Sequence, residues 1–183
     1  MKLVILSGTN RPSSNTRKIV SELDEIYRKL GNPAEVLDLV DLPPEIFNSS
    51  SYAKKPAAFA RFSDAILAAD GVHLVTPEYN GGMPGILKYF IDMLPFPESF
   101  ENRPIAFTGL AAGMWGALRP VEQLQHIFAY RLAHIFPARV FMPNVNNLLD
   151  ENGKINDPEL HERLRQQAEE FIKFIRRLKT VVE

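Results

Sequence analysis

The sequence has no cysteine among its 183 residues. This absence excludes disulfide bonds, thiolate metal sites and cysteine nucleophiles. It is compatible with a reducing compartment, so we expect a cytoplasmic protein. No apolar run reaches the length of a membrane-spanning helix, and residues 1–7 are too short for a signal sequence because a loop follows them directly. We therefore expect no membrane partner.

The chain also lacks an excess of charge of either sign, with 21 basic residues, 22 acidic residues and a formal net charge of -1. Nucleic-acid-binding proteins carry a basic surplus, so we expect no nucleic-acid partner. The missing acidic surplus disfavours a small electron carrier that steers to its partners by a strong negative field. Of the four histidines, His126 and His134 could share one helix face, but a surface or core role is the better interpretation and we expect no metal site.

Five short apolar segments alternate along the chain with five segments of helical periodicity. Wholly apolar strands are typical of a parallel sheet covered on both faces. Strands and helices that alternate need right-handed crossovers, so we predict a doubly wound parallel α/β sheet in one domain of residues 1–183. Gly31 should end the first helix, and Asp157 with Pro158 should begin the last. The predicted strands are residues 3–6, 36–40, 71–76, 104–108 and 138–142, the predicted helices 19–30, 59–69, 84–94, 121–132 and 157–178, and residues 41–56 a long loop.

Ligands of doubly wound sheets bind beyond the carboxyl ends of the strands. The loop after the first predicted strand, residues 8–16, combines one guanidinium with four hydroxyls and two amides, and it ends at a helix N-terminus. Free N–H groups and the helix dipole favour an anion there. A plain capped turn needs only one such residue, so the composition favours a phosphate site. The candidate ligand-binding residues in this loop are Thr9, Arg11, Ser14, Asn15 and Thr16.

Several other phosphate-binding patterns are missing from this loop. It has neither the dinucleotide fingerprint G-x-G-x-x-G nor the P-loop G-x-x-x-x-G-K-[ST]. It also lacks the cysteine of a low-molecular-weight phosphatase and the acidic residues of a response-regulator receiver. Asp38 is then a solvated residue at a strand end. What remains is a cradle for a monophosphate, as FMN requires.

The loops after the third and fourth predicted strands are rich in glycine and proline, which allow a backbone to approach a flat ligand closely. Tyr79 offers an aromatic face, although it could instead pack in the core. The single tryptophan, Trp115, could cover a ligand or an oligomer interface. The candidate ring-binding residues are Pro77, Glu78, Tyr79, Asn80, Gly81, Gly113 and Met114.

These loops resemble three motifs of the NADPH-dependent FMN reductase family, which includes quinone, azo-dye and chromate reductases. The first motif, G-S-x-R-x-x-S-x-N, is matched by Gly8, Thr9, Arg11 and Ser14, with Asn15 and Thr16 near its final position. The second and most specific, P-E-Y-N-x-S-x-P-G-x-L-K, is matched by Pro77, Glu78, Tyr79, Asn80, Pro84, Gly85, Leu87 and Lys88. The third, G-M-x-G-G-x-R, is matched by Gly113, Met114, Gly116 and Arg119.

The resemblance runs over nearly the full chain and implies a flavodoxin-like fold with strand order 2-1-3-4-5. It implies bound FMN, with the phosphate on the first loop and the ring on the other two, and NADPH or NADH as co-substrate. Hydride would pass through the flavin to a quinone, azo dye, free flavin or metal oxyanion. No protein acid or base is obligatory, so we name no catalytic residue. Family members are commonly homodimers or homotetramers.

Three substitutions depart from the family motifs. Thr9 replaces a serine of the first motif and keeps the hydroxyl, whereas the other two put the acceptor in doubt. Gly82 replaces a serine of the second motif, and Ala117 replaces a glycine of the third.

Two alternatives to the reductase are a flavodoxin-type electron carrier and a flavin-binding scaffold without turnover. Trp115, Tyr79 and the third predicted helix are the candidate elements of an oligomer interface.

Overall fold

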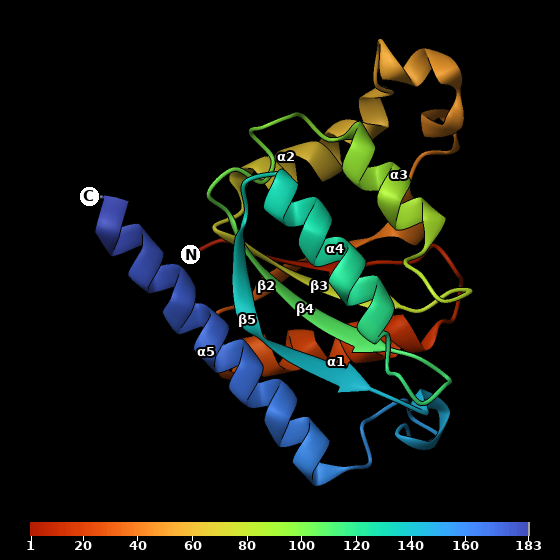
Figure 1. Ribbon diagram of the computed structural model, residues 1–183, viewed down its shortest axis with the longest axis vertical. Coiled ribbons are helices and arrows are strands. Elements are labelled where there is room, and N and C mark those ends of the chain that lie inside the picture. Colours follow the sequence, from red (N-terminus) through yellow and green to blue (C-terminus); the bar gives the residue numbers. More distant parts are fainter. Residues whose placement is uncertain (183) are drawn as a thin grey trace.

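The computed structural model describes residues 1–182, which form a parallel sheet with helices on both faces (Figure 1). The strand order is β2-β1-β3-β4-β5, and every neighbouring pair is parallel. This order confirms the predicted flavodoxin-like topology. The strands are β1 (Leu3–Ser7), β2 (Ala34–Asp38), β3 (Gly71–Pro77), β4 (Pro104–Leu110) and β5 (His134–Met142).

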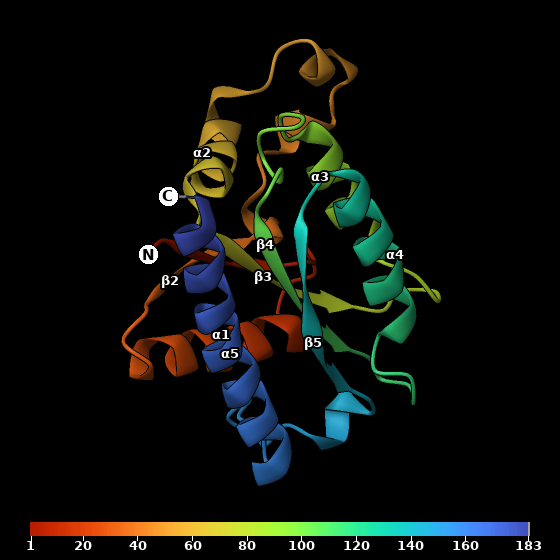
Figure 2. The ribbon, with the colours of Figure 1, turned by 60° about the vertical axis from the view of Figure 1, so that its left-hand side comes forward.

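Two apolar clusters, one on each face of the sheet, form the core. On one face, β1 and β3 pack against α1 and α5, with Ile5, Leu23 and Phe171 fully buried. On the other face α2, α3 and α4 cover the sheet, and Figure 2 shows α3 and α4 across β5 from α5. The helices are α1 (Asn15–Lys29), α2 (Ala60–Ala68), α3 (Gly85–Met93), α4 (Leu118–Tyr130) and α5 (Pro158–Val182).

The predicted helix boundaries are confirmed at both ends of the chain. Gly31 follows α1 with φ +71°, the left-handed conformation that glycine adopts most easily. Asp157 precedes α5, and its Oδ1 accepts hydrogen bonds from the backbone N–H groups of Glu159 and Leu160. The Asp157 cap satisfies donors that the first turn of a helix leaves free.

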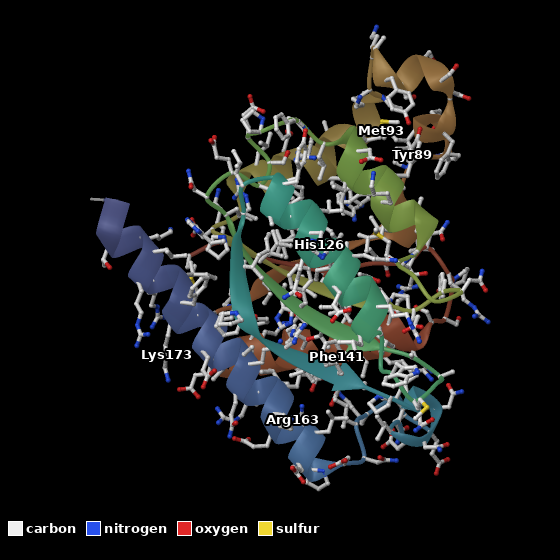
Figure 3. All side chains as sticks on the ribbon, viewed as in Figure 1. Tyr89, Met93, His126, Phe141, Arg163 and Lys173 are labelled. Atoms are coloured by element: carbon white, nitrogen blue, oxygen red, sulfur yellow. The ribbon has the colours of Figure 1, made fainter. Side chains whose placement is uncertain are left out.

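Two local predictions, one in a helix and one in a loop, differ from the structure. Leu132 lies beyond α4 with φ +61° and is 52% exposed, so it is not on the apolar face of that helix. His126 lies on α4 (Figure 3). His134 begins β5, so the two histidines share no helix face. The predicted loop over residues 41–56 contains two short 3-10 helices, Pro44–Phe47 and Ser49–Tyr52.

A chain of buried polar side chains crosses the core from α1 to α5. The Gln167 amide nitrogen donates to two backbone carbonyls, so its Oε1 must accept, and it accepts from the hydroxyl of Thr108 at 2.8 Å. Thr108 then accepts from Nε2 of His73 at 2.9 Å, and Nδ1 of His73 accepts from the hydroxyl of Tyr27 at 2.8 Å. Burial lowers the pKa of His73 to about 3, so the ring is neutral at pH 7.

Candidate functional site

A cavity of about 590 Å³ lies at the carboxyl edge of the sheet, toward which the arrowheads of β4 and β5 point in Figure 1. Four segments line it: residues 11–16 after β1, 77–79 at the end of β3, 110–112 at the end of β4 and 145–146 after β5. Its volume is within the range of about 300–1,000 Å³ that is typical of small-molecule sites. It also lies where ligands of doubly wound sheets bind.

A second cavity, of about 710 Å³, lies at the opposite edge of the sheet. It is lined by the beginnings of β4 and β5 and by the C-terminal part of α5, with Arg103 and Lys179 among its charged residues. Both cations are engaged within the protein, because Arg103 donates to backbone carbonyls and Lys179 pairs with Asp70 at 2.6 Å. The cavity at the carboxyl edge is therefore the better candidate for a functional site.

The amino end of α1 forms one end of the cavity. Ser14 is the N-cap residue, and its hydroxyl accepts from the backbone N–H of Arg17 at 3.3 Å. The first turn of α1 holds no acidic residue, so the helix brings no carboxylate of its own to offset the positive end of its dipole. Arg11 is exposed beside it and adds a full positive charge. This end of the cavity suits an anion.

Asp38 is a buried and paired residue, which corrects the prediction that it is solvated. It is only 7% exposed, and its Oδ2 lies 2.8 Å from Nε of Arg17. Its Oδ1 accepts from the backbone N–H of Val40 at 3.1 Å. Asp38 therefore joins the end of β2 to the first turn of α1, and Arg17 is engaged by this ion pair outside the cavity.

Thr9 and Tyr79 connect the loops after β1 and β3. Their hydroxyl oxygens are 2.7 Å apart, and Thr9 also accepts from the backbone N–H of Arg11 at 3.2 Å. Thr9 is fully buried and lies outside the cavity lining, whereas Tyr79 is half-buried and lines it. The pair therefore holds the Tyr79 ring at the cavity wall rather than in the core.

The segment after β3 turns sharply at residues 79–82. The backbone groups of Tyr79 and Gly82 exchange two hydrogen bonds, of 2.9 and 3.0 Å. Asn80 and Gly81 have φ values of +52° and +78°, as the central residues of a type I′ turn do. Both are exposed at the tip and lie outside the cavity lining, so they shape the turn that presents Tyr79.

Glu78 links the second motif to the third. Its Oε1 lies 3.2 Å from Nη1 of Arg119, whose guanidinium is 5.6 Å from the ring centroid of Trp115. The Glu78 side chain is only 12% exposed, and its Oε2 is buried without a hydrogen-bond partner among residues 1–182. A buried carboxylate oxygen in this position is an acceptor available to a ligand N–H.

The glycine-rich loop after β4 packs closely against the chain that leaves β5. A Cβ at Gly116 would lie 2.9 Å from the backbone nitrogen of Pro143, and one at Gly109 would lie 2.8 Å from the carbonyl of Gly116. Gly113 and Met114 are exposed outside the cavity lining, and Met114 is 70% exposed. Ala111 and Ala112 line the cavity in their place.

The sequence prediction named the loops after three strands and missed the loop after β5. Val145 and Asn146 of this loop line the cavity, and the Asn15 side chain donates to Oδ1 of Asn146 at 2.8 Å. A signal was present, since the asparagine-rich residues 144–147 follow a strand that ends at the same edge of the sheet. Of the predicted site residues, the cavity brings together Arg11, Ser14, Asn15, Thr16, Pro77, Glu78 and Tyr79.

Within residues 1–182, no group of three or more histidine, aspartate or glutamate side chains is placed to hold a metal ion. None of the helices described is both long and apolar enough to cross a membrane.

Comparison with known proteins identifies the family. The family model described as NADPH-dependent FMN reductase matches residues 1–147. The chain belongs to the NADPH-dependent FMN reductase family. It is 30% identical to an NAD(P)H-dependent FMN reductase of Pseudomonas aeruginosa over 98% of this chain and 97% of the relative. It is also 30% identical to a quinone reductase of a Pseudomonas putida strain, over 85% and 84% of the two chains.

The fold comparison agrees with this assignment. The flavoenzyme NAD(P)H:acceptor oxidoreductase FerB of Paracoccus denitrificans superposes with a TM-score of 0.80, over 96% of this chain and 97% of that chain, at 23% identity. At this identity the likeness shows the fold. The protein of the FMN reductase family described here is thus an oxidoreductase whose cofactor is FMN and whose co-substrate is a nicotinamide dinucleotide.

Proposed function

We propose that this cavity binds FMN with the phosphate at the amino end of α1 and the ring against the segments after β3 and β4. There the protein would reduce the flavin with NADPH or NADH and pass the electrons to a quinone-type acceptor. One observation carries the proposal: a single cavity joins an anion-binding helix terminus to a wall with an unpaired buried acceptor. A phosphate ester of a flat, hydrogen-bonding ring system has matching groups at its two ends.

The phosphate end is supported by the kinds of groups present. A phosphate accepts hydrogen bonds and carries negative charge, so it needs donors and a cation. Arg11 supplies the cation, and Ser14, Asn15 and Thr16 supply side-chain and backbone donors at the helix terminus. Thr9 would act indirectly, because its hydroxyl is hydrogen-bonded to the hydroxyl of Tyr79.

The ring end is supported by apolar contact area and by Glu78. Pro77, Tyr79, Leu110 and Ala111 line this part of the cavity. The Oε2 of Glu78 would accept the N–H of the flavin ring, and Arg119 holds the other carboxylate oxygen in place. Asn80, Gly81, Gly113 and Met114 would contribute through loop shape and backbone rather than through side chains that line the cavity.

Bound FMN supplies the redox chemistry, accepting hydride from a nicotinamide and returning it to an acceptor. The residues of the chain have the tasks of binding the phosphate, fixing the ring plane and excluding water from one ring face. The similarity to a quinone reductase supports a quinone as acceptor. An azo dye, free flavin and a metal oxyanion are the further acceptor classes to compare.

The test begins with the absorption spectrum of purified protein loaded with FMN. Anaerobic stopped-flow mixing with NADPH or NADH should bleach the flavin band without any acceptor present. Addition of a quinone should restore the band over repeated cycles. Bleaching by dithionite but by neither nicotinamide would refute the reductase and favour the electron carrier. Bleaching by a nicotinamide without reoxidation by any of the four acceptor classes would favour a scaffold without turnover.

We also propose that the protein acts in the cytoplasm as a homodimer or homotetramer. Trp115 is 51% exposed and, with Tyr79 and α3, is a candidate contact between subunits. Light scattering coupled to size exclusion measures the mass directly, and a monomer at micromolar concentration would contradict the oligomer.

A further inference from the structure

The loop after β5 makes contacts with neighbouring elements on both sides of Asn146 in the sequence. Just before Asn146, the backbone N–H groups of Asn144 and Val145 donate to the carbonyls of Gly113 and Ala111, at 3.1 and 3.0 Å. The segment that lines the cavity at Asn146 is therefore fixed to the loop after β4.

The same loop is tied to α1 farther along the chain. Nζ of Lys154 lies 2.6 Å from Oε1 of Glu22 and 2.5 Å from Oε1 of Glu25, both on α1. These hydrogen bonds raise the pKa of Lys154, and the pair with Lys154 lowers the pKa of Glu25. Glu22 is only 6% exposed whereas Lys154 is 45% exposed, so it is the carboxylate of this pair that is shielded from solvent. The loop that carries Asn146 is thus attached to α1.

The contact between Asn15 and Asn146 has a direct consequence for the anion end of the cavity. The Asn15 amide nitrogen donates to Oδ1 of Asn146 at 2.8 Å across 131 residues of sequence. An amide nitrogen carries two hydrogens, so one remains for another acceptor. With its Oδ1 toward Asn15, Asn146 engages the nitrogen end of the Asn15 amide, which is the end that can donate to a phosphate oxygen.

We propose that Asn146 is a positioning residue for the phosphate of FMN, acting through the side-chain amide of Asn15. The inference rests on the proposed phosphate site and adds a fourth loop to it. Without Asn146 the Asn15 amide rotates freely, and its carbonyl oxygen faces the anion part of the time. The result is a weaker preference for FMN over riboflavin, which has the same ring system and no phosphate.

The experiment is a double-mutant cycle on flavin-free protein. Wild type, Asn15→Ala, Asn146→Ala and the double variant are titrated with FMN and with riboflavin, and quenching of flavin fluorescence gives the dissociation constants. Asn146→Ala should weaken FMN binding by about threefold to tenfold, the effect of one hydrogen bond, with riboflavin binding changed less than about twofold. In the Asn15→Ala background, Asn146→Ala should add almost nothing, because the side chain through which it acts is gone.

Asn147→Ala is the matched control, because Asn147 is the neighbouring exposed asparagine and lies outside the cavity lining. It should bind both flavins as the wild type does. Equal weakening of FMN and riboflavin by Asn146→Ala, or full additivity with Asn15→Ala, would overturn the positioning role. An unchanged FMN preference in Asn146→Ala would overturn it as well. A wild type that binds riboflavin as tightly as FMN would instead overturn the phosphate site itself, and the inference with it.

Discussion

Replacing His73 by phenylalanine should remove a large part of the acid sensitivity of this fold. His73 is fully buried, and its neighbours in the hydrogen-bonded chain, Tyr27 and Thr108, are uncharged at pH 7. Burial lowers its pKa to about 3, whereas the unfolded chain has the ordinary value of about 6.5. Below pH 6.5 the unfolded state therefore binds a proton that the folded state does not. The stability that neutral His73 provides is complete above pH 6.5 and is lost as the pH falls.

The size of the effect follows from linkage. Each pH unit below 6.5 costs about 1.4 kcal/mol, so the free energy of unfolding should fall by about 2 kcal/mol between pH 6.5 and pH 5 from this residue alone. All other side chains are the same in wild type and variant. The difference between the two pH profiles therefore isolates His73.

Urea unfolding of flavin-free protein at pH 7 and pH 5 measures this difference. His73→Phe should be less stable at pH 7, because Tyr27 and Thr108 lose a partner, but it should lose about 2 kcal/mol less than wild type on acidification. His126→Phe, at an exposed position on α4, should keep the wild-type dependence. Identical losses in wild type and His73→Phe would show that His73 is not held neutral and would refute the reasoning.

Three further substitutions test the division of the cavity into a phosphate end and a ring end. Arg11→Ala should weaken FMN by about 1.5–3 kcal/mol, the range for a hydrogen bond to a charged group, while riboflavin titrations stay unchanged and the reduction rate at saturating FMN stays near normal. Gly81→Val places a branched side chain at φ +78°, so FMN and riboflavin titrations should show equal weakening and the flavin absorption bands should shift. Thr9→Val removes the partner of the Tyr79 hydroxyl and should cost about 1–3 kcal/mol in urea unfolding, with slower flavin reduction by stopped flow. Selective loss of FMN over riboflavin in Gly81→Val, or equal loss of both in Arg11→Ala, would contradict the assignment of the two ends.

The sequence by itself determined the order of strands and helices, the end of α1, the start of α5, and most of the candidate site. These features depend on interactions over a few residues: apolar periodicity within one element, the left-handed turn at Gly31 and the cap at Asp157. The family motifs then supplied the strand order and the flavin. Loops that follow parallel strands must meet at one edge, so Arg11 and Glu78 could be predicted to share a cavity.

Tertiary structure alone decided which side chains face the cavity and which support it. Thr9 and Tyr79 are 70 residues apart, and no local preference reveals that their hydroxyl groups form a hydrogen bond behind the cavity lining. Asp38 was expected in solvent. It pairs with Arg17 only because β2 ends beside the start of α1, and the local sequence does not show that these elements are neighbours. Asn146 reaches Asn15 only because β5 ends at the same edge of the sheet and its loop folds back onto α1. Sequence patterns report the conformational preferences of short segments, whereas these contacts exist only once distant segments are packed together.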